Sequence, residues 1–295
     1  MASQCRTRGG GRGVNRRPVQ VIAVSGGKGG VGKTNVAINL SIALAEAGKR
    51  VVILDADFGL ANIDVLLGLR SSKTIEDVLS GDCSLQEVML TGPAGIKIIP
   101  ASSGTRRLTM LSSLEHAGLI RAFSDIAEQL DVLIVDTAAG ISDSVVNFVS
   151  AAHEVLLVVC NEPSSITDAY AMIKLLNRDF GRSRFRIVAN MVADDAEGLQ
   201  LFETLNSVCR QFIDVALIYT GAVPFDQNLR DAVRQRRPVI LNAPSSVSAR
   251  ALRALGNKLL TWPLPSRVEG HLLFFVEQLT AMDASNRAAV VHNYE

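Results

Sequence analysis

The sequence predicts an α/β protein with a doubly wound, mostly parallel sheet of about seven or eight strands flanked by helices. Short runs of Val, Ile and Leu, typical of strands buried on both faces of a parallel sheet, recur from residue 20 to about 220. The stretches between these runs are long enough for crossover helices. A glycine-rich loop between the first run and a strongly apolar helix is a third indication of this fold.

Seven segments are predicted as strands from their aliphatic and β-branched content. In chain order they are Gln20–Val24, Val51–Leu54, Ile96–Ile99, Val132–Val135, Val155–Val159, Arg186–Ala189 and Val215–Tyr219. Residues 35–47 are dominated by Ala, Ile, Leu and Val, which predicts a deeply packed helix that Gly48 ends.

The composition favours a soluble protein of the reducing cytoplasm. The net charge of +1 gives no general attraction to nucleic acid, so no specific nucleic-acid partner is expected. Cys5, Cys83, Cys160 and Cys209 contain no C-x-x-C pair, which argues against a disulfide framework or a zinc site. No apolar run reaches the length of a membrane span, and no signal-peptide core follows the basic N-terminus.

Three regions are expected along the chain. Residues 1–18 contain five arginines and a run of three glycines, which predicts a disordered basic tail. Such a tail could contact nucleic acid or anionic lipid, but a plain solvated tail is favoured. Residues 19–265 are expected to form one α/β domain, and residues 266–295 an amphipathic helix and a tail.

The loop after the first strand has the phosphate-binding pattern G-x-x-x-x-G-K-[ST]. Its backbone N–H groups and the following helix N-terminus would surround phosphate oxygens. Lys33 would reach the β- and γ-phosphates, and the Thr34 hydroxyl would ligate Mg²⁺. The chain is therefore predicted to bind a nucleoside triphosphate with Mg²⁺. The expected contacts are Gly26, Gly27, Lys28, Gly29, Gly30, Val31, Gly32, Lys33, Thr34 and Asn35.

Acidic residues end two of the predicted strands, where the chemistry of such sheets gathers. Asp55 and Asp57 follow the second strand, and either hold a magnesium-bound or attacking water or cap the next helix. Asp136 ends the fourth strand and would hold Mg²⁺ through a water, ahead of a flexible switch at 138–140. Thr137 stands where many motor ATPases carry a catalytic glutamate, which predicts slow turnover.

The segment K-G-G-V-G-K-T resembles the deviant Walker A motif of the MinD/ParA ATPases. The resemblance implies that Lys28 crosses a dimer interface to the phosphates of the other subunit, although a solvated loop cation is nearly as compatible with the sequence. It also implies that Asp57 positions the attacking water and that Asp55 lies in the second shell of the magnesium ion. The catalytic set is then Lys28, Lys33 and Asp57.

The nucleobase contacts are also implied by this resemblance. In that family an asparagine at the end of the sixth strand and the backbone near a proline after the seventh contact adenine. Here these positions carry Asn190 and the segment with Pro224 and Asp226. A simple turn role for Asn190 remains equally compatible with the sequence. No Asn-Lys-x-Asp motif for guanine occurs, so ATP is favoured over GTP.

A narrower resemblance covers roughly residues 18–282. G-G-K-G-G-V-G-K-T-N, L-D-A-D-F-G-L-A-N-I-D-V-L-L-G, D-T-A-A-G-I, N-E-P-S-S-I-T-D-A-Y-A-M-I-K-L-L and G-H-L-L-F-F-V-E-Q-L resemble the flagellar number regulators of the FleN/FlhG family. This implies an ATP-dependent homodimer that acts on a flagellar transcription activator or with the GTPase FlhF. Residues 1–18 lack the D-Q-A-x-x-L-R segment with which some members stimulate FlhF, so restraint of the activator is favoured.

Residues 271–282 are expected to form a helix with an apolar stripe of Leu272, Phe275, Val276 and Leu279. Packing on the domain and reversible attachment to a membrane are both compatible with this pattern. The resemblance implies attachment, and with it a position at the inner face of the membrane or at a cell pole.

Two other functions remain open from the sequence. A ParA-type DNA-partition ATPase would need a basic surface, for which Arg230, Arg234, Arg236 and Arg237 form the densest cluster outside the tail. An ATP-dependent metabolic ligase is less favoured because no motif indicates a second substrate pocket.

Overall fold

The computed structural model describes residues 18–57, 62–100, 113–264 and 275–277. Eight strands of this part form one sheet in the order β3-β4-β2-β5-β1-β6-β7-β8. Neighbours are parallel except for β3, which runs antiparallel to β4. The strands are β1 Gln20–Ser25, β2 Val51–Ala56, β3 Leu90–Thr91, β4 Lys97–Ile99, β5 Val132–Thr137, β6 Glu154–Cys160, β7 Arg184–Val192 and β8 Ala216–Pro224.

The predicted fold class and all seven predicted strands are confirmed. Most of the observed strands are longer at one or both ends, since the backbone pairing continues beyond the apolar runs. Strand β3 was not predicted, because its two residues are half-buried or exposed and do not belong to an apolar run. They pair with the outer edge of β4 and so end the sheet on that side.

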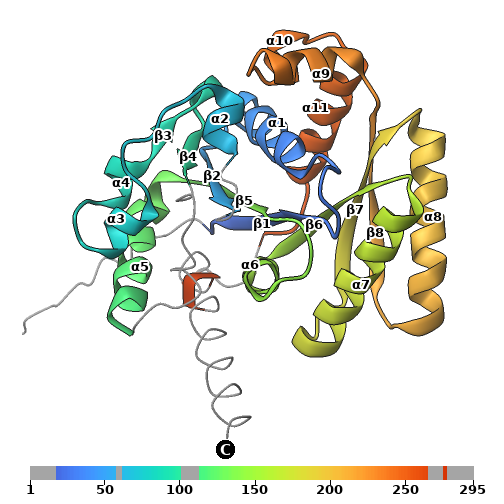
Figure 1. Ribbon diagram of the computed structural model, residues 1–295, viewed down its shortest axis with the longest axis horizontal. Coiled ribbons are helices and arrows are strands. Elements are labelled where there is room, and N and C mark those ends of the chain that lie inside the picture. The colour runs from blue at the N-terminus through green and yellow to red at the C-terminus, as the bar shows by residue number, and fades with distance from the viewer. Residues whose placement is uncertain (1–17, 58–61, 101–112, 265–274, 278–295) are drawn as a thin grey trace, which may run out of the picture.

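The helices form two layers on the sheet (Figure 1). One face carries α1, α2, α9, α10 and α11, whose buried side chains form one hydrophobic cluster with Ile22 and Val24 of β1. The other carries α5, α6, α7 and α8, and receives Val21 and Ala23 of the same strand. The alternation along β1 explains why both faces are apolar. The bounds are α1 Lys33–Glu46, α2 Ile63–Leu67, α3 Ile75–Leu79, α4 Leu85–Val88, α5 Ser113–Ile126, α6 Asp143–Ala151, α7 Pro163–Phe180, α8 Asp195–Phe212, α9 Gln227–Arg234, α10 Val239–Asn242 and α11 Val247–Leu259.

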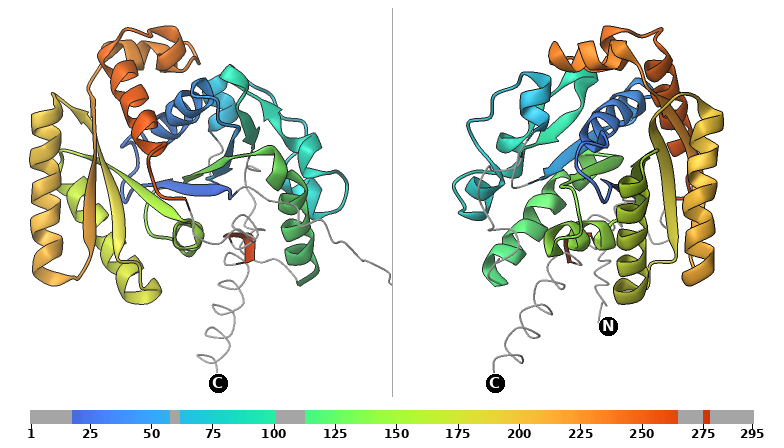
Figure 2. Two further views of the ribbon diagram at one scale, coloured as in Figure 1. Left: turned by 180° about the vertical axis from the view of Figure 1, so that it is seen from behind. Right: turned by 45° about the vertical axis from the view of Figure 1, so that its right-hand side comes forward.

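The order of the strands places the site. β1 lies between β5 and β6, and the loop after β1 leads directly into α1 on one face (Figure 2). Parallel α/β sheets bind ligands at such a switch point, outside the carboxyl ends of the strands.

The predicted helix at 35–47 begins two residues earlier than expected, at Lys33, because Gly32 turns the loop into the helix with φ 90°.

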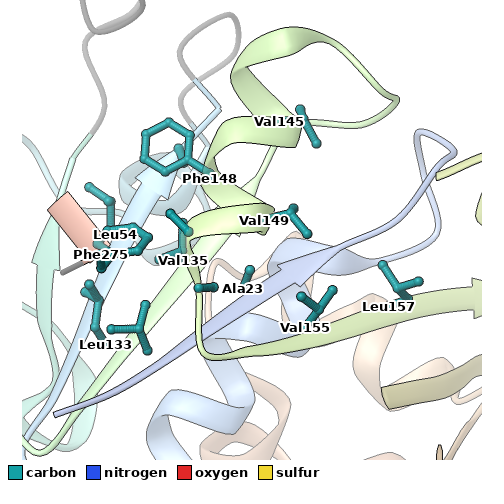
Figure 3. Packing of buried hydrophobic residues seen from close by; sticks show 14 of the residues in the cluster. Ala23, Leu54, Leu133, Val135, Val145, Phe148, Val149, Val155, Leu157 and Phe275 are labelled. Atoms are coloured by element: carbon teal, nitrogen blue, oxygen red, sulfur yellow. The ribbon is translucent and has the colours of Figure 1, made fainter. Parts of the chain in front are cut away.

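A short C-terminal helical turn, residues 275–277, packs against the face that carries α5 and α6. Phe275 and Val276 are fully buried, and the ring centre of Phe275 lies 6.3 Å from that of Phe148 on α6. Figure 3 shows Phe275 beside Leu54 and Val135 of the sheet. The rest of the predicted helix at 271–282 and nearly all of the expected tail at 1–18 lie outside the described residues. No helix in the described part is both long enough and apolar enough to cross a bilayer.

Candidate nucleotide-binding site

The loop from Gly26 to Gly32 is fixed by its neighbours as well as by its glycines. A Cβ atom on Gly27 would lie 2.4 Å from the backbone carbon of Asp168 on α7, so loop and helix touch backbone to backbone. Gly32 has a left-handed φ of 90°, and a Cβ there would lie 2.4 Å from the Asn190 side-chain nitrogen. Both positions therefore need glycine, and the loop keeps a shape in which its N–H groups can face a phosphate.

Lys33 lies inside the loop rather than in solvent. Only 7% of the residue is exposed, and its Nζ donates a hydrogen bond to the Lys28 carbonyl at 3.3 Å. Burial lowers the pKa of Lys33, and the nearby carboxylates of Asp136 and Asp57 oppose this effect. A cation held this way lies where the β- and γ-phosphates of a bound nucleotide are expected.

Lys28 contacts the start of α7. Its Nζ forms an ion pair with Glu162 and donates a hydrogen bond to the Ser164 hydroxyl at 2.8 Å. The hydrogen bond to Glu162 raises the pKa of Lys28, so the lysine remains charged. No role for Glu162 or Ser164 was predicted, although both lie in the segment N-E-P-S-S between the end of β6 and the first turn of α7. The single chain thus holds Lys28 through its own residues.

Asp55 binds both ends of the segment after β2. Its Oδ1 accepts a hydrogen bond from the Asp57 N–H at 3.0 Å, and its Oδ2 accepts bonds from the Asn62 and Ile63 N–H groups at 3.0 and 3.2 Å. Burial raises the pKa of Asp55 to about 6, although these three bonds oppose it. Asp57 is half-buried and close enough to Lys33 to interact with its charge. Residues 58–61 of the expected switch lie outside the described part.

Asp136 has one carboxylate oxygen that lacks a hydrogen-bond partner among the residues that the structure describes. It pairs with Asp55 across the β2–β5 register and is 1% exposed. The Thr34 hydroxyl bonds to its carboxylate, while Oδ1 is buried without a hydrogen bond from any residue in the described ranges. Burial raises the pKa of Asp136 to about 8. An orphaned buried oxygen beside a threonine hydroxyl is a donor set that Mg²⁺ accepts, so the residues present fit the metal.

The segment after Asp136 packs on the phosphate loop. The Thr137 hydroxyl donates to Ser25 Oγ at 2.8 Å and is 2% exposed, so it stabilises the strand end rather than facing the loop mouth. Gly140 N–H donates to the Gly26 carbonyl at 3.4 Å. The expected second switch therefore contacts the loop that would hold the phosphates.

A cavity of about 380 Å³ opens beside Gly32 and Asn35, where a nucleoside would continue from the phosphates. Asn190 and Pro224, two of the predicted nucleobase contacts, line it. The Asn190 Nδ2 donates to the Val31 carbonyl at 2.7 Å, which leaves its carbonyl oxygen to accept a bond. Adenine offers an amino donor at the position where guanine has an acceptor, so this orientation favours adenine.

Asp226 also lines the cavity, but both of its carboxylate oxygens already accept hydrogen bonds from the protein. Oδ2 accepts from the N–H and hydroxyl of Ser248 at 3.1 and 2.7 Å, and Oδ1 accepts from the N–H and side-chain amide of Asn228 at 2.9 Å each. Although burial opposes it, these bonds hold the pKa of Asp226 well below its usual range. In this state its carboxylate joins the start of α9 to α11.

Comparison with known proteins assigns the family. The ParA family, described as NUBPL iron-transfer P-loop NTPase, matches residues 18–260. This chain belongs to the ParA family of P-loop NTPases. The MinD/ParA resemblance is thereby confirmed.

This ParA-family chain is 58% identical to the Antiactivator FleN of Pseudomonas aeruginosa over 271 residues, which cover 92% of this chain and 97% of that protein. It is 35% identical to the Flagellum site-determining protein YlxH of Helicobacter pylori over 266 residues, or 88% of this chain and 90% of that protein. The MinC:MinD cell division protein complex of Aquifex aeolicus superposes with a TM-score of 0.67 at 27% identity, covering 84% of this chain and 99% of the other.

Proposed function

We propose that this chain is a slow, Mg²⁺-dependent ATPase whose ATP-driven dimerisation regulates flagellar number or placement, by restraining a flagellar transcription activator. The observation that carries the flagellar part is the 58% identity to Antiactivator FleN over 92% of the chain. The switching part is supported by two lysines on one phosphate loop, next to two carboxylates that end neighbouring strands.

In this proposal the loop at residues 26–32 binds the phosphates through backbone N–H groups, and Lys33 adds charge to them. Thr34 and Asp136 hold Mg²⁺, with Asp55 behind them. When bound, the metal offsets negative charge on the phosphate oxygens during transfer to water. The protein supplies position and charge, because phosphoryl transfer needs little else from it.

Asp57 is the residue we assign to orient the attacking water. It follows β2, and the carboxylate of Asp55 fixes its backbone N–H. The neighbouring candidate on β5 is Thr137, whose hydroxyl is engaged by Ser25. A threonine so placed takes no proton from water, which supports slow hydrolysis suited to a switch rather than a motor.

Lys28 connects hydrolysis to dimerisation in this scheme. In the single chain it is paired with Glu162 and Ser164. To reach the phosphates of a second subunit it must leave these partners, so dimerisation exchanges one anionic contact for another. Because both Lys28 and Glu162 are partly exposed, solvent screens the ion pair, and breaking it costs little free energy.

The C-terminal segment is the second element we assign to the switch. Phe275 and Val276 pack beside α6, which begins directly after the segment at 138–142. A shift of that segment on ATP binding would be transmitted to α6 and would loosen this contact. Residues 271–282 would then become available for the inner face of the membrane, a cell pole, or a partner such as the GTPase FlhF.

The test is the solution mass of the full chain with Mg²⁺ and either ADP or a non-hydrolysable ATP analogue, for the wild type and Lys28→Ala. We expect a dimer only for the wild type with the analogue. A mass that does not depend on the nucleotide contradicts the switch. Flagella are then counted in a bacterium that lacks its own number regulator, where the wild type is expected to restore the count and Lys28→Ala is not.

A further inference from the structure

Two side chains at the rim of the nucleoside cavity remain without a role in the function described above. Phe225 follows β8, is 56% exposed, and lines the cavity together with Arg230 of α9. The Arg230 guanidinium carbon lies 5.8 Å from the centre of the Phe225 ring. This is within the range of a cation–π contact.

A hydrogen bond fixes the Phe225 backbone, whereas the Arg230 guanidinium is able to contact a ligand. The Phe225 N–H donates to the Val192 carbonyl at 2.7 Å, directly beyond Asn190 and Met191. The guanidinium of Arg230 has no hydrogen bond or ion pair among the described residues, apart from its contact with the ring. Arg234, one turn further along α9, is instead paired with Asp231 at 3.1 Å.

The Phe225 ring is exposed at the rim of the cavity, so its face is accessible to a ligand bound there. The cavity adjoins the phosphate loop at Gly32, so a bound nucleotide would place its base toward the rim. Bases stack on aromatic rings and on arginine guanidinium planes, whose flat π surfaces match their own.

We propose that Phe225 and Arg230 form a nucleobase clamp, in which the base stacks on the Phe225 ring and Arg230 closes over its outer face. The proposal rests on nucleotide binding at this site and adds two base-binding residues to it. Stacking through both faces needs about 7 Å, or two contacts of about 3.5 Å. The present separation of 5.8 Å is shorter, so the exposed Arg230 side chain must move outward by about 1 Å as the base enters.

The clamp and Asn190 would divide the recognition between them. Stacking acts on any purine, because every base has a π face, so the clamp should bind adenine and guanine nucleotides alike. The Asn190 carbonyl oxygen, fixed by the bond to Val31, distinguishes the amino group of adenine. Removal of the clamp should therefore lower affinity without changing the preference for adenine.

The experiment is calorimetric titration of the full chain with MgADP, MgGDP and inorganic pyrophosphate. The variants are Phe225→Ala, Phe225→Leu, Arg230→Ala and Arg230→Lys, with Arg234→Ala as an exposed control on the same helix. Base stacking predicts about 5- to 150-fold weaker ADP binding for each alanine variant of the clamp. Arg230→Lys should lose most of the same affinity, because it keeps the charge but not the plane.

Pyrophosphate affinity separates the clamp from a general loss of structure. If the clamp acts on the base, pyrophosphate binds all variants equally, Arg234→Ala binds ADP like the wild type, and the ADP-to-GDP ratio is unchanged. Wild-type ADP affinity in Phe225→Ala and Arg230→Ala overturns the clamp but leaves the proposed function intact. An equal loss of pyrophosphate binding also overturns it, because the residues would then act on the loop. A wild-type protein that binds no ADP overturns the proposed function as well.

Discussion

The strongest test of the C-terminal contact is Phe275→Ala. The Phe275 side chain is fully buried and touches a core that includes Phe148, Leu54 and Val135. Truncation of such a side chain removes its transfer free energy and leaves a cavity, which together cost about 3–5 kcal/mol. In a domain of this size, about 1 kcal/mol shifts the unfolding temperature by roughly 2–4 °C, so a decrease of roughly 6–20 °C is expected.

The loss of unfolding free energy in Phe275→Ala has an upper limit, which is the free energy with which the C-terminal segment docks on the domain. If the segment can leave the core while the domain stays folded, the variant loses no more than the free energy of docking. A loss below about 3 kcal/mol therefore measures how firmly the segment is held. The global free energy of unfolding is measured by chemical denaturation of the wild type, Phe275→Ala, Phe148→Ala and the double variant.

The double variant supplies the control. Aromatic pairs in contact contribute about 0.5–1.5 kcal/mol beyond their burial, so the two substitutions should not add. Coupling below about 0.3 kcal/mol, or a Phe275→Ala variant that is as stable as the wild type while Phe148→Ala is destabilised, would refute the packing of this segment on α6.

Three further changes test the site. Asp226→Asn should lower the free energy of unfolding by about 1.5–3 kcal/mol at pH 7, because charge-assisted hydrogen bonds to α9 and α11 are lost. The native pKa lies below the unfolded value of about 3.9, so this stability is present above that pH and is lost as the pH falls further. Gly32→Ala should abolish ADP binding, since its methyl group would meet Asn190. Glu162→Gln should allow the dimer to form with the ATP analogue at a severalfold lower concentration, because Lys28 loses its anionic partner.

Each of these has a matched control. The gap between wild type and Asp226→Asn should narrow in urea titrations between pH 5 and pH 3, and a constant gap would show that the charge is irrelevant. Gly48→Ala has a similar φ of 83° but open space around the new methyl group, so it should keep ADP binding. Glu203→Gln alters an exposed glutamate on α8 and should dimerise like the wild type. Unchanged or weaker dimerisation of Glu162→Gln would contradict the restraint on Lys28.

The parts of the fold with strong local signals could be predicted from the sequence. The strands of the central sheet contain continuous apolar runs, and the loop at residues 26–34 has a fixed residue spacing between a strand and a helix. Asp55 and Asp136 could be placed at one edge because each ends a strand of a parallel sheet, and the register puts them side by side. These features follow from local composition and one topological rule.

The contacts that the sequence could not show are long-range ones. Lys28 and Glu162 are 134 positions apart, and Asn190 and Val31 are 159 apart. No periodicity links such pairs, and they form only because β1, β6 and β7 are neighbours in the sheet. For Asp226 the position could be predicted but the hydrogen-bond partners could not. Its position at the cavity was anticipated, but its hydrogen bonds to Ser248 depend on how α11 packs.

The contact between Gly27 and Asp168 has a mechanical consequence. With backbone against backbone, no side chain can bend to absorb a movement, so the phosphate loop and α7 must shift together. From Asp168 the helix continues for another 12 residues to Phe180, or about 18 Å at 1.5 Å per residue. A small tilt of α7 at the loop therefore displaces its C-terminal end by a larger distance. A movement of the phosphate loop would thus displace the surface at the C-terminal end of α7.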